Sequence, residues 1–377
     1  MYKKGLITLK TIEKLYENHK PLYPLERFCN PSEALFIDIE TTGLKKETNS
    51  IYLIGCGHYT AGGFCVTLFF ADNAGEECEI LKCFMDHMKD YTYLLHFNGT
   101  KFDIPFLEYK ARSYGFTDIF KDHFQLDIYR LCGPLRYLLF PDSMKQKSIE
   151  AFLGIDRDDK YNGGELIEVY SEYVKYGRSE DLKLLITHNM EDVLGMHLIL
   201  PILYYLDLKG APVSYNQFKV NCYYTYEGLP AKEVIFSFNT RIHLPKSFTA
   251  KTETMYLKYC ESNDEITIRL PIYTGEMKVF FENYRDYCFL PGEDKAILKT
   301  LAQSLPKDRY KRATRETCYQ KVAGDFVKQP SSLFTPALRE SYKDKKRYFR
   351  FPDSFNKEAA EEFGRELINV FFTKKHR

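Results

Sequence analysis

The sequence predicts an α/β fold in its first half, with a mixed sheet flanked by helices, and a β-rich (α+β) domain in its second half. Three strand-like runs open the first half, and helices then alternate with strands, a pattern typical of a sheet covered by helices. The second half contains short alternating segments separated by turn residues, which favour antiparallel strands. The pattern changes near residue 207, and 377 residues are ample for two or more domains.

The elements of the first half follow from residue spacing. Apolar and β-branched runs predict strands, and apolar residues three and four apart predict helices. Residues 1–33 carry charges throughout and predict an N-terminal helical extension, beginning with a short amphipathic helix; residues 34–207 are expected to form the first domain. Within it we expect strands at 34–40, 51–59, 65–72, 93–98 and 124–131 and helices at 76–91, 103–115 and 179–206.

The second domain is expected to span residues 208–377. Clear alternation predicts three strands joined by short turns at 261–264 and 274–276, a meander of antiparallel strands. An earlier strand and two helices complete the prediction. The strands cover 233–239, 254–260, 265–273 and 277–287, and the helices cover 294–305 and 356–372.

Composition excludes several classes of protein. With 44% hydrophobic and 28% charged residues, the chain has a globular composition, and no apolar run reaches the length of a membrane span. The first residues lack the apolar region of a signal peptide. The ten cysteines are scattered, without the spacing of a zinc site. We therefore expect reduced thiols, a cytoplasmic location and no membrane partner.

Two carboxylates interrupt the first apolar strand, ALFIDIETTGL. Side chains alternate along a strand, so Asp38 and Glu40 point to one face while Ile37 and Ile39 point to the other. Like charges held together on an apolar strand are costly unless a positive group lies between them. The alternative is that the pair only keeps an edge strand soluble.

Two further acidic signals follow. In LLHFNGTKFDIPFL a strand ends near Asn98, and Asp103 begins a helix, where a carboxylate is also an ordinary N-cap. In HNMEDV, His188 and Asp192 are four residues apart on one helix and share a face. The alternative for this second pair is a contact on the helix surface.

The three segments together resemble the motifs of the DEDD superfamily of 3′-to-5′ exonucleases, which have a ribonuclease H-like fold. DIETTGL, HFNGTKFDIPFL and HNMED are similar to its first, second and third motifs. The likeness covers about residues 34–207 and is greatest to the bacterial YprB-type ribonuclease H-like domain, whose third motif also reads H-N-x-x-D. The chain has its histidine four residues before the last aspartate, a spacing at which the superfamily usually has tyrosine.

The resemblance implies a site of two divalent cations, Mg²⁺ or Mn²⁺. Two such ions can bracket the attacking and leaving oxygens of a phosphodiester, and hard cations prefer oxygen ligands. By resemblance, the metal ligands are Asp38, Glu40, Asp103 and Asp192, with His188 as the general base. The implied substrate-binding residues are Thr41, Thr42, Leu44, Asn98 and Phe102, and Asp127 is a possible supporting residue behind the ligands.

These observations predict a metal-dependent nuclease, most specifically a 3′-to-5′ exonuclease, that hydrolyses single-stranded DNA or RNA from the 3′ end. One alternative is a non-catalytic nucleic-acid-binding protein on a nuclease fold, against which the four intact carboxylates argue. Another is a ribonuclease H-like endonuclease. The Phe-Asp pair of the second motif and the His-x-x-x-Asp helix favour the exonuclease.

The C-terminal region is basic. Residues 301–377 contain 18 Lys and Arg against 10 Asp and Glu, although the whole chain has a net charge of only +1. The segment SYKDKKRYFRF, residues 341–351, interleaves basic with aromatic residues. Such a segment can bind a nucleic acid strand through phosphate contacts and base stacking. It can equally be a basic surface strand anchored by core aromatics.

Overall fold

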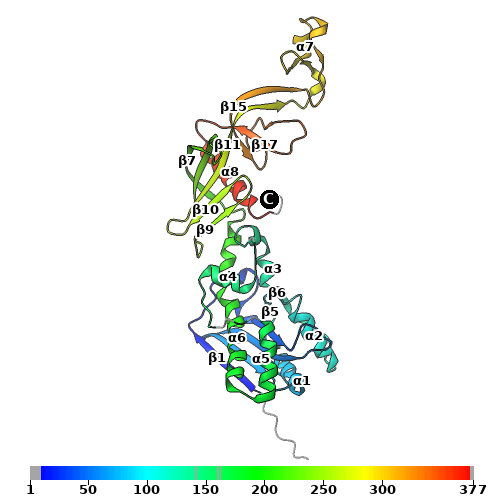
Figure 1. The fold of residues 1–377 in the computed structure, drawn as a ribbon, viewed down its shortest axis with the longest axis vertical. Coiled ribbons are helices and arrows are strands. Elements are labelled where there is room, and N and C mark those ends of the chain that lie inside the picture. Colours follow the sequence, from blue (N-terminus) through cyan, green and yellow to red (C-terminus); the bar gives the residue numbers. More distant parts are fainter. Residues whose placement is uncertain (1–9, 141, 159–160, 162, 374–377) are drawn as a thin grey trace, which may run out of the picture. The chain divides into compact units, whose positions relative to one another are not determined.

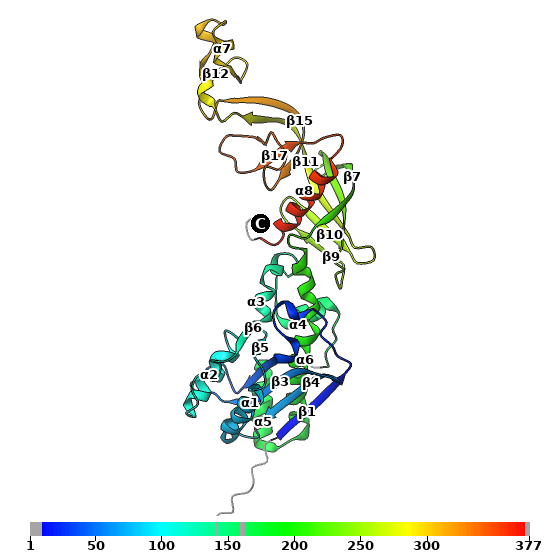
Figure 2. The same ribbon diagram turned by 180° about the vertical axis from the view of Figure 1, so that it is seen from behind.

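The computed structural model describes residues 10–140, 142–158, 161 and 163–373. The chain forms two compact units, and in Figures 1 and 2 the first unit is coloured from blue to green and the second from green to red. The first unit runs to residue 206 except for residues 137–139, which join residues 207 onward in the second unit.

The first unit is built on a six-stranded sheet with the order β1-β4-β3-β2-β5-β6. Strands β1 to β4 pair antiparallel, whereas β2 with β5 and β5 with β6 pair parallel. The prediction of a mixed sheet is therefore confirmed. The strands are β1 (Lys10–Glu17), β2 (Ala34–Thr41), β3 (Ile51–Thr60), β4 (Gly63–Phe70), β5 (Tyr93–His96) and β6 (Phe124–Asp127).

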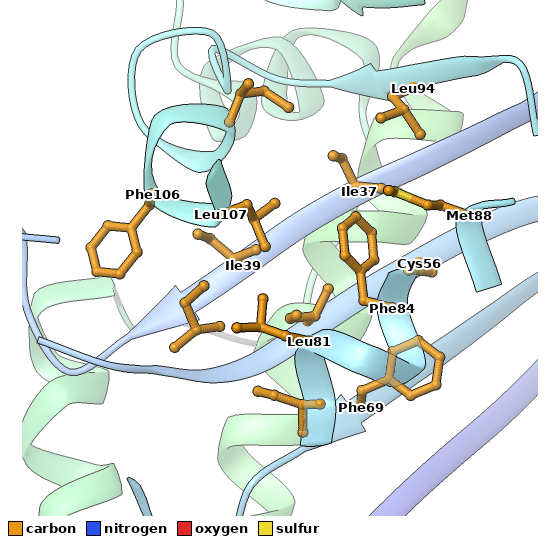
Figure 3. Close-up of a cluster of buried hydrophobic side chains, with 14 of the residues drawn as sticks. Ile37, Ile39, Cys56, Phe69, Leu81, Phe84, Met88, Leu94, Phe106 and Leu107 are labelled. Atoms are coloured by element: carbon orange, nitrogen blue, oxygen red, sulfur yellow. The ribbon is translucent and has the colours of Figure 1, made fainter. Parts of the chain in front are cut away.

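Helices cover both faces of this sheet. Figure 3 shows apolar side chains of α1 (Glu77–Met88) and α2 (Asp103–Ser113) packed against the β2 residues Ile37 and Ile39. On the other face, Tyr170 of α5 (Gly163–Tyr176) stacks on Tyr52 of β3 with ring centroids 3.9 Å apart. Helix α6 (Ser179–Leu198) lies beside α5, as Figure 1 shows. The two short helices α3 (Ile128–Leu131) and α4 (Gln146–Leu153) lie between α2 and α5 in the chain.

The predicted N-terminal helix is wrong over the described residues, because Lys10–Glu17 forms strand β1. It pairs with β4 along its full length, from Lys10 opposite Phe70 to Glu17 opposite Gly63. The local sequence suits either structure, and the open edge of β4 decides between them, because a strand there satisfies the backbone N–H and C=O groups of that edge as well as its own. The charged side chains of β1 are typical of an edge strand. Residues 1–9 of the prediction lie outside the described residues.

Most other boundaries in the first unit differ from the predictions by one to three residues, and two elements end much earlier than predicted. The strand expected at 124–131 ends at Asp127, where α3 begins. The long helix expected at 179–206 ends at Leu198, and a 3-10 helix follows over Leu200–Leu208. Pro201 explains this second change, since proline has no backbone N–H to donate within an α-helix.

The second unit contains an eight-stranded antiparallel sheet and one long helix, α8 (Lys357–Val370). Phe363 of α8 packs its ring on Phe236 and Phe349 of the sheet. The predicted β-rich architecture is confirmed. The strands are β7 (Val213–Tyr224), β8 (Pro230–Thr240), β9 (Phe248–Lys251), β10 (Tyr256–Cys260), β11 (Glu265–Phe280), β15 (Tyr319–Gln329), β16 (Leu338–Arg339) and β17 (Arg347–Arg350).

Three predictions in the second unit are wrong. The strand expected at 277–287 ends at Phe280, and Tyr284–Asp286 forms a 3-10 helix. The expected turn at 274–276 lies inside β11, a continuous strand of 16 residues. Its first half pairs with β8 and its second half with β15, where Gly275 lies opposite Gly324. The helix expected at 294–305 is instead strand β13 (Lys295–Leu298) followed by the single turn α7 (Lys299–Ala302). Strand β13 joins β12 (Tyr287–Leu290) and β14 (Lys311–Arg312) in a small sheet, a pairing that local spacing cannot reveal.

Candidate active site

Strand β2 presents two carboxylates to the face of the sheet opposite the apolar cluster of Figure 3. Ile37 and Ile39 belong to that cluster, and Asp38 and Glu40 alternate with them. Glu40 is only 8% exposed although its side chain is an ionisable carboxyl group. The alternative of an edge-strand solubility device is wrong, because β2 lies between β3 and β5 inside the sheet.

Helix α6 brings an imidazole and a third carboxylate to the same face. His188 Nε2 lies 3.5 Å from Glu40 Oε1 and 3.1 Å from Asp192 Oδ2. His188 is only 3% exposed, so the two residues are not a contact on the helix surface. One turn of α6 therefore places the side chains of His188 and Asp192 beside Glu40 of strand β2.

The next residue of α6, Asn189, contacts the other carboxylate of β2. Its Nδ2 donates a hydrogen bond of 2.7 Å to Oδ2 of Asp38. Gly55 of β3 lies directly opposite Asp38 in the sheet, and a Cβ there would lie 2.1 Å from Asn189 Oδ1. Glycine at this position thus permits the close approach of α6 that forms the hydrogen bond.

Asp103 reaches the site from the start of α2. The N-cap position of this helix is Phe102, and an oxygen of Asp103 accepts a hydrogen bond of 3.3 Å from the backbone N–H of Ile39. Asp103 as a whole is 8% exposed. Asp103 is therefore linked to the strand between Asp38 and Glu40, and the N-cap alternative is wrong.

The electrostatics of these carboxylates reflect burial and crowding. Burial, with the negative charges of Asp192, Asp103 and Glu40, raises the pKa of Asp38 well above its usual value. Burial also raises the pKa of Asp103 to about 7. Burial acts in the same direction on Asp192, but the hydrogen bond and charge of His188 and the charge of Arg157 outweigh it and lower its pKa.

The donor set fits a divalent cation. Ligand atoms of Glu40, His188 and Asp192 all lie within 4.8 Å of one another. Carboxylate oxygens are the ligands that Mg²⁺ and Mn²⁺ prefer, and a positive charge would relieve the repulsion that raises the pKa of Asp38. Asp38 and Asp103 extend the same acidic cluster from β2 and α2.

An arginine that sequence reasoning missed lies against this cluster. Arg157 Nη2 lies 2.6 Å from Asp192 Oδ1, and its Nη1 lies 3.1 Å from Oε2 of Glu150 on α4. Gln146 of α4 donates to Glu150 and to the backbone carbonyl of Asp192, at 3.0 and 2.9 Å. Oδ1 of Asp192 thus binds the guanidinium, and Oδ2 faces His188. Arg157 follows α4 outside any motif, so no signal in the sequence marked it.

The last residue of β2 and the residues after it form a braced loop with one projecting side chain. Thr41 Oγ1 donates to the carbonyl of Gly43 at 2.9 Å, and Thr42 exchanges two hydrogen bonds of 2.9 Å with the backbone of Ser50. Leu44 follows and is 81% exposed. The loop is fixed at its base, and the leucine side chain faces solvent.

Asp127 accepts hydrogen bonds from the loop that leads to Asp103. Its Oδ1 accepts a hydrogen bond of 2.9 Å from the N–H of Asn98, and its Oδ2 accepts one of 2.8 Å from the hydroxyl of Thr100. Asn98 has a φ of 62°, a left-handed conformation that asparagine tolerates. Phe102 packs partly against the apolar cluster and lies 5.5 Å from the ring of Phe106.

Several solved structures are similar to this chain at low identity. A family B DNA polymerase from the archaeon Pyrobaculum calidifontis is 14% identical, with a TM-score of 0.39, covering 73% of this chain and 39% of the polymerase. Exonuclease I without ligand is 12% identical, with a TM-score of 0.32, covering 56% of this chain and 57% of that one. A metal-free complex of Escherichia coli exonuclease I with single-stranded DNA is 11% identical, with a TM-score of 0.30, covering 55% and 53%.

The chain thus spans less than two thirds of the length of each of these proteins. A search of curated proteins found no match. Within the part of the chain that the structure describes, none of the helices is both long enough and apolar enough to cross a membrane. Residues 35–204 match the family model of the RNase H superfamily. The first unit therefore has a ribonuclease H-like fold, and the family match supports a nuclease.

Proposed function

We propose that the protein is a metal-dependent 3′-to-5′ exonuclease that hydrolyses phosphodiester bonds in single-stranded DNA or RNA. One observation carries the proposal. Asp38, Glu40, Asp103 and Asp192 come from three separate elements and gather with His188 around strand β2 of a ribonuclease H-like sheet. The likeness of the three motifs to the DEDD superfamily, and to its YprB-type relatives, is part of this proposal.

Two divalent cations, Mg²⁺ or Mn²⁺, would supply positive charge for the phosphate and activate the attacking water. The four carboxylates are the residues that would hold them. Buried carboxylates with raised pKa values bind protons when no other positive charge is near, so Asp38 and Asp103 are suited to exchange those protons for a cation.

His188 is the proposed general base. Its side chain is 4% exposed, and its Nε2 faces Glu40 and Asp192 within 3.5 Å. An imidazole titrates near neutral pH and can therefore accept the proton of the attacking water. The two neighbouring carboxylates would stabilise the imidazolium that forms.

The braced loop after β2 is the proposed contact for the 3′-terminal nucleotide. Backbone groups near Thr41 and Thr42 would position it, and the exposed side chain of Leu44 would pack against its base. Asn98 and Phe102 would line the same site, with the loop of Asn98 held in place by Asp127.

Product analysis tests this proposal. Single-stranded DNA and RNA labelled at the 5′ end are incubated with Mg²⁺ or Mn²⁺, beside a circular single-stranded DNA. We expect a ladder that shortens from the 3′ end, an uncut circle and no cleavage by Asp38→Asn. Asp86→Asn, an exposed aspartate of α1, is the matched control and should cleave normally.

Two outcomes would contradict the proposal. Nicking of the circle would indicate an endonuclease. Tight binding without cleavage, unchanged by Asp38→Asn, would indicate a nucleic-acid-binding protein on a nuclease fold.

A further inference from the structure

The second unit contains a cavity that the carboxylate site does not use. Its volume is about 290 Å³, and it lies beside the end of β11 and strand β16. It is lined by two arginines, three aromatic residues and one glutamate: Arg315, Arg339, Phe280, Phe281, Tyr342 and Glu282. Guanidinium groups beside aromatic rings are a combination that recognises phosphate and base together.

Arg339 is held in this cavity by aromatic rings. Its guanidinium carbon lies 5.2 Å from the ring centroid of Phe280 and 5.3 Å from that of Tyr342. Its Nη1 donates to the carbonyl of Tyr342 at 2.9 Å, while its Nε is buried and has no hydrogen-bond partner among the described residues. A buried N–H of this kind calls for an explanation, and an acceptor on a bound ligand would satisfy it.

The cavity also has an excess of positive charge. Burial, together with the charge of nearby Arg347, lowers the pKa of Arg339. Arg315 is exposed, and its guanidinium carbon lies 5.7 Å from the ring centroid of Tyr284. Glu282 is the acidic residue that lines the cavity, against two arginines. An anionic group would offset the repulsion between the guanidinium groups of Arg339 and Arg347.

The two ends of the basic segment at residues 341–351 have different surroundings. Phe349 of β17 is 3% exposed and anchors a strand of the sheet, as the structural alternative for this segment expects. Tyr342 instead lines the cavity and packs against Phe280 and Arg339. Only the first part of the segment therefore offers an aromatic ring to a ligand here.

We propose that this cavity binds one nucleotide of a single-stranded nucleic acid, with its phosphate on Arg315 and Arg339 and its base against Tyr342 or Phe281. The inference rests on the proposed function, since a nuclease of this kind must hold a single strand. Arginine donates two parallel hydrogen bonds to phosphate, and a tyrosine or phenylalanine ring stacks on any base. A duplex should bind less well because its bases are already stacked.

Fluorescence anisotropy in EDTA tests the site without cleavage. Labelled single-stranded DNA, single-stranded RNA and duplex DNA are titrated with the full chain over a range of salt concentrations. Arg315→Gln should weaken binding of single strands severalfold and reduce the slope of log K against log salt by about 0.7. Tyr342→Ala should weaken it about fivefold or more, whereas Tyr342→Phe should bind like the wild type.

Arg241→Gln is the matched control for charge. Arg241 is exposed and follows β8 near the Glu265 end of β11, whereas the cavity lies at the Phe280 end. This control should bind like the wild type, and Glu282→Gln should bind more tightly. Equal effects of Arg315→Gln and Arg241→Gln on binding would overturn the inference. Affinities of Arg315→Gln and Tyr342→Ala that both stay within about twofold of the wild-type affinity would also overturn it.

Failure of this inference is distinct from failure of the proposed function. Cleavage lost in Asp38→Asn, with binding unaffected by the cavity variants, would remove the cavity site and leave the exonuclease. Binding that depends on Arg315 and Tyr342 in a protein that cleaves nothing would support the cavity site and remove the exonuclease.

Discussion

Asn189 donates a hydrogen bond of 2.7 Å to Asp38 and so joins helix α6 to strand β2 at the centre of the candidate active site. The contact depends on Gly55, which lies opposite Asp38 on the neighbouring strand. A Cβ at Gly55 would approach Asn189 to 2.1 Å and Val193 to 2.7 Å. The distance between helix and sheet, and with it the placement of His188 and Asp192, is therefore set by a residue with no side chain.

The first prediction concerns this contact. Gly55→Ala should destabilise the protein by about 1–3 kcal/mol, because the added methyl group overpacks a filled interface. It should also lower nuclease activity by displacing α6. Urea denaturation and a cleavage assay measure the two effects. Gly133→Ala is the control, since nothing lies within 4 Å of a Cβ at that position. Equal stability of the two variants would contradict the packing argument.

The second prediction concerns Arg157. Its side chain is 9% exposed and that of its partner Glu150 is 2% exposed, so Arg157→Gln leaves a buried carboxylate without its cation. The free energy of unfolding should fall by about 3 kcal/mol. Adding Glu150→Gln should restore part of this loss. Arg178→Gln, which breaks an ion pair at a side chain that is 52% exposed, should change stability little. A similarly small effect for Arg157→Gln would contradict the claim that the buried carboxylate of Glu150 depends on this cation.

A third prediction concerns metal binding. Mg²⁺ or Mn²⁺ should raise the melting temperature more at pH 8 than at pH 5.5. Protons compete with the cation for Asp38 and Asp103, whose pKa values burial raises, to about 7 for Asp103. Thermal unfolding with and without metal measures the shift. Asp38→Asn should lose most of it, and Asp86→Asn should keep it. A shift that is equal at both pH values would argue against a site at these two carboxylates.

A fourth prediction concerns acid stability. Burial, followed by the charge of His19, lowers the pKa of His197 from 6.5 to about 4. The folded protein therefore binds fewer protons than the unfolded chain between these values, and stability falls as the pH decreases from 6.5 toward 4. The loss from this residue is about 3 kcal/mol. Urea denaturation across this range should show a smaller fall for His197→Gln than for the wild type, and an identical fall would refute the assignment.

The residues that the sequence placed correctly lie on regular elements. A strand repeats every two residues and a helix nearly every four, so Asp38 with Glu40, and His188 with Asp192, had to share a face. The resemblance of the three motifs to the DEDD superfamily then implied that these faces meet. Arg157 and Glu150 could not be found in this way, because Arg157 lies in a segment without periodicity and its contact with Asp192 joins positions 35 residues apart.

Long-range pairing explains the errors in the fold. Strand β1 exists because β4 has an open edge, and nothing within residues 10–17 specifies that partner. Gly275 resembles a turn residue, but the pairing of β11 with both β8 and β15 keeps the strand continuous through it. In each case a tertiary contact outweighs a local preference.

The most direct test of the central claim is the rate of phosphodiester cleavage by the wild type and Asp192→Asn in Mg²⁺, Mn²⁺ and EDTA. Asp192→Asn keeps the size of the side chain and removes the charge that a cation requires. The account predicts cleavage in either metal, none in EDTA, and a loss to background in the variant under every condition. Cleavage that persists in EDTA, or in Asp192→Asn at the wild-type rate, would contradict it.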